Sequence, residues 1–260
     1  MNRSLLLSLL ALSLLFVLPG CLPHRPGDDA DDAADDPGGG EEEPVPPTSA
    51  LFIGNSFTFW HDGLETHVEA LRAGTGDSTF ETEEETQGGA SLEVMWDESN
   101  ARSRIEQGGF DVVVLQEDIP ETSVESFHTY ARLFDGAIRE SGARPVFFMA
   151  WDYDRLDWIS MDEIADAHWT IAEELDIEVA PVGLAWKRAS DERPSLDMYG
   201  GDDEHPSIHG TYLAATTIYS VLFQESPVGL TYTPDQQGGV SEDEAAFLQG
   251  VAWDEVQAPR

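Results

Sequence analysis

Two short segments, far apart in the chain, carry residue types that can relay a proton. Ser56 follows the apolar run 50–53 within Gly-Asn-Ser, where a strand turning into a helix can expose a hydroxyl and aim backbone N–H groups at an anion. Near the other end, Asp202 stands three residues before His205. An Asp at this spacing can accept the imidazole Nδ1–H and leave Nε2 free to take a hydroxyl proton. Each segment alone is also an ordinary turn, but together they indicate a serine nucleophile with a histidine base.

The elements that must position these segments follow from the pattern after residue 49, which alternates short apolar runs with amphipathic stretches. The apolar runs are β-branched or aromatic, as in strands of a parallel sheet buried on both faces: 50–53, 112–115, 145–150 and 177–182. The other stretches predict helices at 61–73, 91–106, 124–141, 160–175, 208–224 and 241–256. This alternation predicts a three-layer α/β/α sandwich with a central parallel sheet. In such a fold, functional residues gather at the carboxyl ends of the strands.

The two segments, taken in their order along the chain, resemble sequence blocks of the SGNH (GDSL-like) hydrolase superfamily. Gly54-Asn55-Ser56 is similar to the first block, which carries the nucleophile, and Asp202-x-x-His205-Pro206 is similar to the last. The likeness covers roughly residues 50–225. It implies a flavodoxin-like SGNH hydrolase fold with Ser56 as nucleophile, His205 as general base and Asp202 as the residue that orients the base. It implies neither a metal nor an organic cofactor.

The second and third blocks concern the groups that would bind an oxyanion. Residues 87–92, Gln-Gly-Gly-Ala-Ser-Leu, resemble the second block, which implies that the N–H of Gly89, with Gly88 as second choice, joins that of Ser56 in an oxyanion hole. The third block usually reads Gly-x-Asn-Asp, whereas this chain has Leu-Gln-Glu around Gln116, as a subset of bacterial SGNH-like proteins does. The Gln116 amide carries the same donor as Asn, one methylene further out. It either completes the oxyanion hole or has a purely structural role.

The N-terminal part of the chain divides into an export signal and a tether. Residues 1–21 combine Arg3 with a short apolar core and end in Leu-Pro-Gly-Cys, which resembles a bacterial lipobox and implies a lipidated Cys21. Pro19 departs from the small residue that the pattern prefers, so an ordinary secretory signal is the alternative. Residues 22–49 are acidic and rich in Pro and Gly, as in a disordered tether. We therefore expect export to a bacterial cell envelope with a lipid anchor, or else secretion.

Composition excludes several classes of partner and site. The formal net charge of -38 would repel nucleic acid and anionic lipid headgroups. The single cysteine rules out an intramolecular disulfide and a cysteine-based zinc site. His209 is four residues from His205, a spacing that a metal pair can use, but a place on the helix surface is the preferred interpretation. Asp152, Asp154 and Asp157 resemble a Ca²⁺ loop only loosely, and solvated acids are preferred there too.

The sequence thus favours a hydrolase domain at 50–228 with a C-terminal extension, 229–260, that contains one helix. The resemblance implies a surface-anchored serine esterase. Because no long apolar lid segment is present, the expected substrate is a small-molecule or carbohydrate ester with a short acyl group on a polar scaffold. The alternative is a non-catalytic binding or scaffolding lipoprotein that retains the fold. The two differ in whether Ser56 reacts covalently with an acylating reagent.

Overall fold

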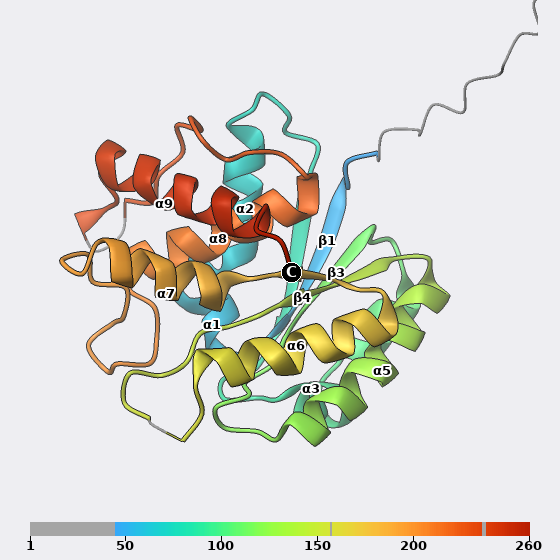
Figure 1. The fold of residues 1–260 in the computed structure, drawn as a ribbon. Coiled ribbons are helices and arrows are strands. Elements are labelled where there is room, and N and C mark those ends of the chain that lie inside the picture. The colour runs from blue at the N-terminus through green and yellow to red at the C-terminus, as the bar shows by residue number, and fades with distance from the viewer. Residues whose placement is uncertain (1–44, 157, 236–237) are drawn as a thin grey trace, which may run out of the picture. The chain divides into compact units, whose positions relative to one another are not determined.

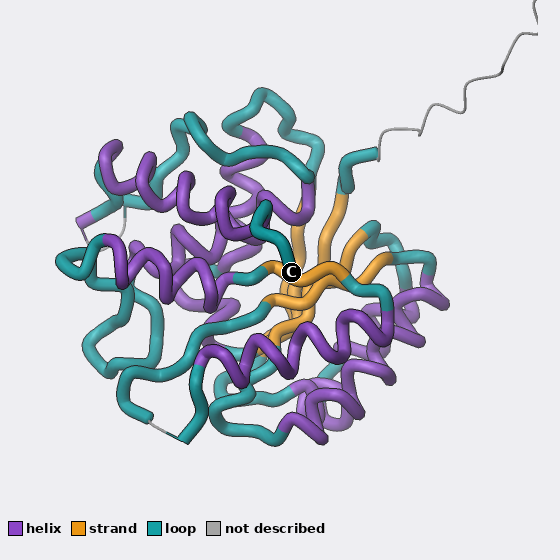
Figure 2. The backbone as a smooth tube through the Cα atoms, in the orientation of Figure 1, coloured by secondary structure: helices purple, strands orange, loops and turns teal. Residues whose placement is uncertain are grey.

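A parallel sheet of five strands lies at the centre of the computed structural model, which describes residues 45–156, 158–235 and 238–260 (Figures 1 and 2). The strand order is β2-β1-β3-β4-β5. The strands are β1 (Ser49–Gly54), β2 (Glu81–Thr86), β3 (Val112–Gln116), β4 (Arg144–Phe148) and β5 (Glu178–Ala180). Since chain order reverses beside β1, the carboxyl ends of β1 and β3 lie at a topological switch point, where ligands bind in open α/β sheets.

Helices cover both faces of this sheet (Figure 1). One face carries α2 (Leu64–Ala73), α7 (Val182–Glu192), α8 (Ile208–Phe223) and α9 (Glu242–Val256). The other carries α3 (Leu92–Glu98), α4 (Ala101–Gln107), α5 (Val124–Ser141) and α6 (Met161–Leu175). A single-turn helix, α1 (Ser56–Phe59), and a 3-10 turn, η1 (Trp60–Asp62), connect β1 to α2. The predicted three-layer α/β/α sandwich is confirmed.

Side-chain alternation along the strands divides the interior into two cores. In β1, Phe52 faces the core under α2 and α8, whereas Leu51 and Ile53 face the core under α3 to α6. Both faces are fully buried, which explains why the inner strands read as continuous apolar runs. Helix α8 is buried at every position except His209 because α2, α7 and α9 pack around it. This helix begins directly after the loop that carries His205.

The structure corrects several boundaries. Strand β2 was not predicted, because its sequence, Glu-Thr-Glu-Glu-Glu-Thr, has none of the apolar character of the other strands. It is an edge strand whose side chains are exposed or half-buried. The predicted helix 91–106 is two helices, broken at residues 99–100. Helix α7 was also not predicted, and the strand predicted at 177–182 is shorter because α7 starts at Val182.

The predicted signal segment and most of the predicted tether, residues 1–44, lie outside the described residues, and so does Cys21. Within 229–260 the structure has α9, which packs against α7 and α8. None of the described helices combines the length and the apolarity needed to cross a membrane.

Candidate active site

Ser56 lies at the carboxyl end of β1, as the first residue of α1. Asn55 caps this helix, since its Oδ1 accepts a hydrogen bond from the N–H of Phe57 at 3.0 Å. Gly54 is required just before it: a Cβ there would come within 2.5 Å of Thr58 Oγ1 and 2.6 Å of Gln116 Oε1. The side chains of Thr58 and Gln116 therefore pack closely against the turn, and Ser56 follows it at the carboxyl edge of the sheet.

The structure brings Ser56, His205 and Asp202 together. His205 Nε2 lies 2.8 Å from Ser56 Oγ, and His205 Nδ1 lies 2.7 Å from Asp202 Oδ2. The other oxygen of Asp202 accepts the backbone N–H of His205 at 2.9 Å, so one carboxylate fixes both the ring and its backbone. This is a hydroxyl, imidazole and carboxylate in continuous hydrogen-bonded contact. Such an arrangement can move a proton off the hydroxyl.

The loop that follows β2 reaches the same edge. The Gln87 N–H donates to the carbonyl of Gly54 at 3.1 Å, and the Ala90 N–H closes a turn onto the Gln87 carbonyl at 3.1 Å. Gly89 has a φ of +66° within this turn, and a Cβ on Gly88 would lie 3.9 Å from the Phe59 ring. The turn therefore lies against α1, beside the nucleophile. Within the part of the chain that the structure describes, the N–H of Gly89 has no protein acceptor.

Gln116 lies at the carboxyl end of β3, but its amide does not face a reacting group. The side chain is fully buried; Oε1 accepts the Asn55 N–H at 2.8 Å and the Thr58 hydroxyl at 3.3 Å, and Nε2 donates to the Glu117 carbonyl at 3.1 Å. The two bonds accepted by Oε1 tie the turn around Ser56 to the end of β3. The geometry supports the structural alternative for Gln116, and it does not place the amide in an oxyanion hole. The extra methylene lets the amide reach the backbone under the nucleophile.

Two buried acids continue this support. Glu117 accepts the N–H groups of Leu92 at 3.3 Å and Asp118 at 2.8 Å, and burial raises the pKa of Glu117 to about 7. Asp118 accepts the Asn55 amide at 3.0 Å and the Tyr153 hydroxyl, and burial raises its pKa to about 6. We call Gln116, Glu117 and Asp118 the brace segment. It ties the β1, β2 and β4 loops together under the site.

Two residues of the site were not assigned from the sequence. Asn55 was quoted only as part of the Gly-Asn-Ser turn, yet its side chain caps α1 and bonds to Asp118. Trp60 stacks on His205, with ring centroids 4.1 Å apart and an angle of 21° between the planes. The signal was available, because Trp60 follows Ser56 by four residues and a helical turn puts such positions on one face.

His209, the second histidine considered from the sequence, and Trp151, which follows β4, lie outside the hydrogen-bonded chain of Ser56, His205 and Asp202. His209 Nε2 is 3.5 Å from Glu244 Oε2, on the α8 surface that faces α9. Trp151 is fully buried, stacks on Trp186 at 4.0 Å and donates its Nε1–H to the Glu204 carbonyl, so it supports the His205 loop from within the core. Among the described residues, no group of three or more His, Cys, Asp or Glu side chains is arranged to hold a metal ion.

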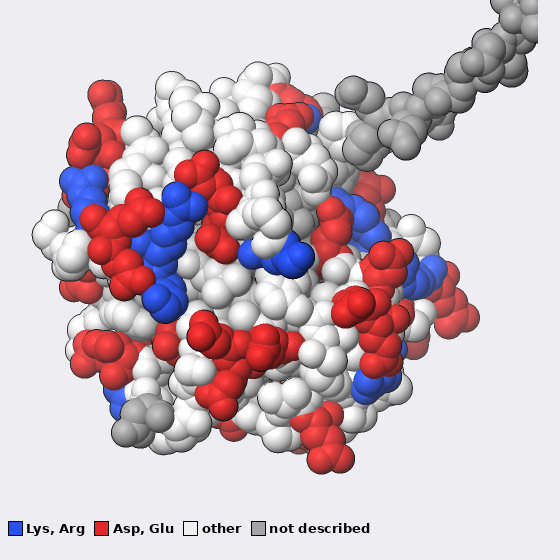
Figure 3. Space-filling model, in the orientation of Figure 1, with Lys and Arg blue, Asp and Glu red and all other residues white. Residues whose placement is uncertain are grey.

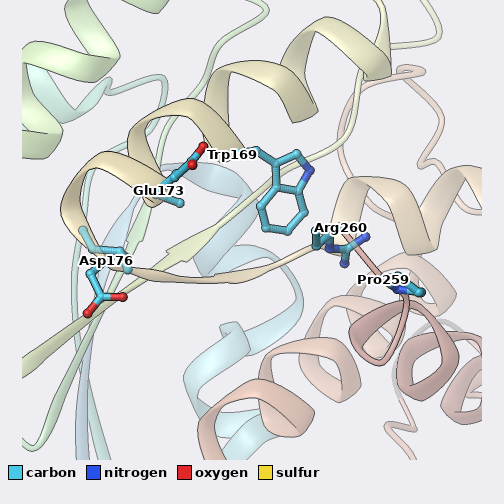
Figure 4. Close-up of a pocket in the computed structure, with 7 residues that line it drawn as sticks. Trp169, Glu173, Asp176, Pro259 and Arg260 are labelled. Carbon is cyan, nitrogen blue, oxygen red and sulfur yellow. The ribbon is translucent and has the colours of Figure 1, made fainter.

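A cavity of about 260 Å³ adjoins the imidazole and is lined by Trp60, Asp202, His205 and Pro206, among others. A larger one, of about 740 Å³, is lined by Trp169, Glu173, Asp176 and Arg260 (Figure 4). Asp176 precedes β5, so this second cavity lies toward the amino edge of the sheet, opposite the site. The guanidinium of Arg260 lies 4.4 Å from the Trp169 ring centroid, and no nucleophile and base pair lines the cavity.

Among the charged side chains, acids far outnumber bases. Figure 3 shows Asp and Glu in several groups over one face, with Lys and Arg lying among them. Near the site, Arg155 bridges Glu121 and Glu204, at 2.9 and 2.5 Å, which joins the loop after β3 to the His205 loop. Among the described residues, the three acids named near the triad, Asp202, Glu204 and Glu121, outnumber this one bridged guanidinium.

Comparison with known proteins shows which fold this is. No family model and no curated protein matches the sequence. Among solved structures, a DUF4886 family protein from Bacteroides uniformis is 18% identical, with a TM-score of 0.62, covering 80% of this chain and 94% of that one. A Slackia heliotrinireducens protein assigned to the SGNH hydrolases is 23% identical, with a TM-score of 0.57, covering 67% and 98%.

An acetylxylan esterase from Geobacillus stearothermophilus is 15% identical, with a TM-score of 0.54, covering 67% of this chain and 94% of that one. At these identities the likeness concerns the fold. The parallel five-stranded sheet with helices on both faces is thus a known architecture. The chain has the SGNH hydrolase fold.

Proposed function

We propose that the protein is a serine esterase. The observation that carries the proposal is the chain of contacts from Ser56 Oγ through both nitrogens of His205 to Asp202, at 2.8 and 2.7 Å. The site lies at the carboxyl edge beside the switch point, where this class of fold binds ligands. Burial raises the pKa of Asp202, but hydrogen bonds from the His205 ring and from two backbone N–H groups outweigh it and hold that pKa below its ordinary value. Asp202 therefore stays ionised and can stabilise an imidazolium.

The reaction proceeds by acyl transfer. His205 Nε2 takes the proton of Ser56 Oγ as Oγ bonds to the ester carbonyl carbon, and His205 then gives that proton to the departing alcohol oxygen. Water attacks the acylated Ser56, passing its proton to His205, and the acid leaves as Oγ is reprotonated. The backbone N–H groups of Ser56 and Gly89 bind the oxyanion, the first at a helix N-terminus and the second in the turn beside it.

The proposed substrate is a short acyl ester on a carbohydrate or similar polar scaffold. The acetylxylan esterase of the same fold supports this class. The small cavity beside the imidazole and the anionic surroundings favour a short acyl group and a neutral alcohol.

The second candidate is a non-catalytic binding or scaffolding protein with this fold. It is favoured by one observation, the burial of Gln116 beneath the site, which leaves two backbone donors for an oxyanion where the superfamily usually has a third from Asn. Loss of one donor typically costs about 3–4 kcal/mol of transition-state stabilisation. A protein of this kind would bind esters without turning them over.

Hydrolysis of p-nitrophenyl acetate by the purified chain separates the two candidates. We expect turnover by the wild type and background rates for Ser56→Ala and His205→Ala, with both variants folded by circular dichroism. An ester panel from acetyl to long-chain acyl groups then tests the preference for short chains. Turnover by folded Ser56→Ala at the wild-type rate, or none by the wild type, would overturn the esterase proposal.

We further propose that the protein is exported and anchored through a lipidated Cys21. The support is the sequence alone: the apolar segment ending in Leu-Pro-Gly-Cys and the acidic tether. Two lipid signals give stable attachment, whereas one chain is marginal. In a host that processes lipoproteins, Cys21→Ser should remain as precursor or become soluble. Mass spectrometry showing wild-type protein that begins elsewhere, without lipid, would contradict the anchor.

A further inference from the structure

The imidazole of His205 is held from three directions. Its two nitrogens are hydrogen-bonded to Ser56 Oγ and Asp202 Oδ2. Trp60 covers one face, 4.1 Å away and within 21° of parallel, and Phe57 meets the ring edge-on at 5.6 Å and 73°. Hydrogen bonds at the two nitrogens still allow the ring to tilt about the line that joins them. The stack on Trp60, together with the edge contact of Phe57, opposes this tilt.

Trp60 reaches His205 because of its place relative to the nucleophile. The Trp60 N–H donates to the carbonyl of Ser56 at the end of α1, so the two residues are separated by one helical turn. Positions four apart lie on the same face of a helix. One short element therefore presents the hydroxyl to Nε2 and the indole to the ring face, and it fixes both groups relative to one another.

The backbone after Trp60 is held in a conformation that L-residues rarely adopt. His61, Asp62 and Gly63 have φ values of 51°, 71° and 88° in succession. Non-glycine residues there are strained unless surrounding contacts impose the conformation.

Helices on either side supply those contacts. The carbonyl of His61 lies 2.7 Å from Nε2 of His67 in α2. The ring Nδ1 of His61 lies 2.8 Å from the hydroxyl of Thr211 in α8. His67 is in turn 2.7 Å from the Tyr232 hydroxyl. These contacts fix the backbone directly after Trp60, which limits movement of the indole over His205.

We propose that Trp60 is a positioning residue for the general base. When His205 takes the proton of Ser56 it becomes a cation, and the electron-rich face of an indole stabilises a cation stacked on it. The same contact keeps Nε2 aimed at Ser56 Oγ and then at the leaving alcohol. The inference rests on the proposed function, since it assigns Trp60 a part in that reaction. Trp60 exchanges no proton and forms no bond with the substrate.

The test uses Trp60→Leu, Trp60→Phe and a matched control, Trp169→Leu. Trp169 is also partly buried and also has a cationic group over its ring, Arg260, but it lies toward the opposite edge of the sheet. With p-nitrophenyl acetate, and with rates expressed per titrated active site, Trp60→Leu should lower kcat about tenfold with KM within about twofold. Trp60→Phe keeps an aromatic face and should recover most of kcat. Trp169→Leu should stay near wild type.

A second measurement does not depend on binding of the ester substrate. Inactivation by phenylmethanesulfonyl fluoride depends on activation of Ser56, and its rate should fall in Trp60→Leu by a factor similar to that in kcat. A rise in KM with unchanged kcat would make Trp60 a substrate contact and overturn the proposal. A lower melting temperature with normal kcat per titrated site would make it purely structural and also overturn it. If instead folded Ser56→Ala retained activity, the esterase proposal itself would fail.

Discussion

At the scale of single residues, the Asp202 carboxylate accepts hydrogen bonds from both the ring and the backbone of His205. One oxygen holds the His205 ring and the other holds the His205 backbone. Its neighbour Asp203 lies in the same loop with a φ of 58°, a conformation that Asn also tolerates. The pair therefore allows the same chemical change to be made at a contacting and a non-contacting position.

Asp202→Asn should lower kcat by about a hundredfold to ten-thousandfold, because the amide disfavours the required tautomer and loses the charge that stabilises the imidazolium. The loss should be smaller than in His205→Ala. Asp203→Asn should stay within about twofold of wild type. Steady-state kinetics on both variants check this, and an equal loss at the two positions would show that general loop charge, rather than orientation of His205, matters.

Gln116→Ala should act on stability more than on turnover. It leaves the Asn55 N–H without its buried acceptor and opens a cavity, which together should lower the free energy of unfolding by about 2–4 kcal/mol. Thr58→Val, which removes a second donor to the same oxygen, should cost about 1 kcal/mol. Denaturant unfolding and active-site titration measure both quantities. A hundredfold loss of kcat per titrated site without loss of stability would return Gln116 to the oxyanion hole.

The sequence predicted the site residues where their chemistry depends on local spacing. Asp202 and His205 lie three apart on one loop, so their contact follows from the chain itself. Gln116 could not be resolved in this way, because Asn and Gln offer identical donors and only the hydrogen bonds in the structure show which way the amide points. Trp60 was missed because an aromatic residue after a turn is far more often part of a core.

At the scale of elements, the brace segment joins loops that are distant in sequence. Glu117 holds the start of α3 through the Leu92 N–H, and the turn that carries Gly89 leads directly into that helix. Asp118 holds the Asn55 cap of α1 and the Tyr153 hydroxyl beyond β4. Glu117 and Asp118 thus fix the loops after β1, β2 and β4 relative to one another, and this requires that their carboxyl groups be buried.

That burial gives stability a defined pH dependence. A carboxyl group whose pKa is raised to about 7 in the folded state contributes fully below its unfolded pKa and loses that contribution as pH rises toward 7. Glu117→Gln removes this titration, so its melting temperature should fall less than that of the wild type between pH 5 and pH 8. The exposed Glu106→Gln, at the end of α4 that leads into the start of β3, is the control and should keep the wild-type slope. Parallel curves for wild type and Glu117→Gln would show that Glu117 stays ionised throughout.

Most of the buried elements were predicted from the sequence, and α7 is the exception, since the apolar run 177–182 was taken as one strand up to its first residue. Strands β1, β3 and β4 are apolar because both of their faces are covered. Strand β2 was not predicted, because a strand at the edge of a sheet can be held by backbone pairing alone. It pairs with β1 from Ser49 opposite Glu81 to Gly54 opposite Thr86. Its acids discourage further strands from adding at that edge.

At the scale of the whole molecule, the charge is far from balanced. Residues 45–260 carry 42 Asp and Glu against 11 Lys and Arg. Most of the ion pairs in the described residues involve exposed side chains, which contribute little each. Repulsion among the remaining acids therefore opposes folding.

Added salt should raise the melting temperature by several degrees between about 0.05 and 1 M, because it screens this repulsion. Thermal melts in sodium chloride and in choline chloride at equal ionic strength test the cause. Equal increases in the two salts would show screening, and an increase with sodium alone would show specific cation binding. A melting temperature that falls with salt would contradict the prediction.

The esterase proposal depends most directly on the reactivity of Ser56. Treatment of the folded chain with a fluorophosphonate, followed by intact-mass and peptide mass spectrometry, measures that reactivity. We expect one adduct per chain, located on Ser56, absent in Ser56→Ala and strongly slowed in His205→Ala. Failure of the folded wild type to label, or an adduct on another residue that persists in Ser56→Ala, would contradict Ser56 as the nucleophile.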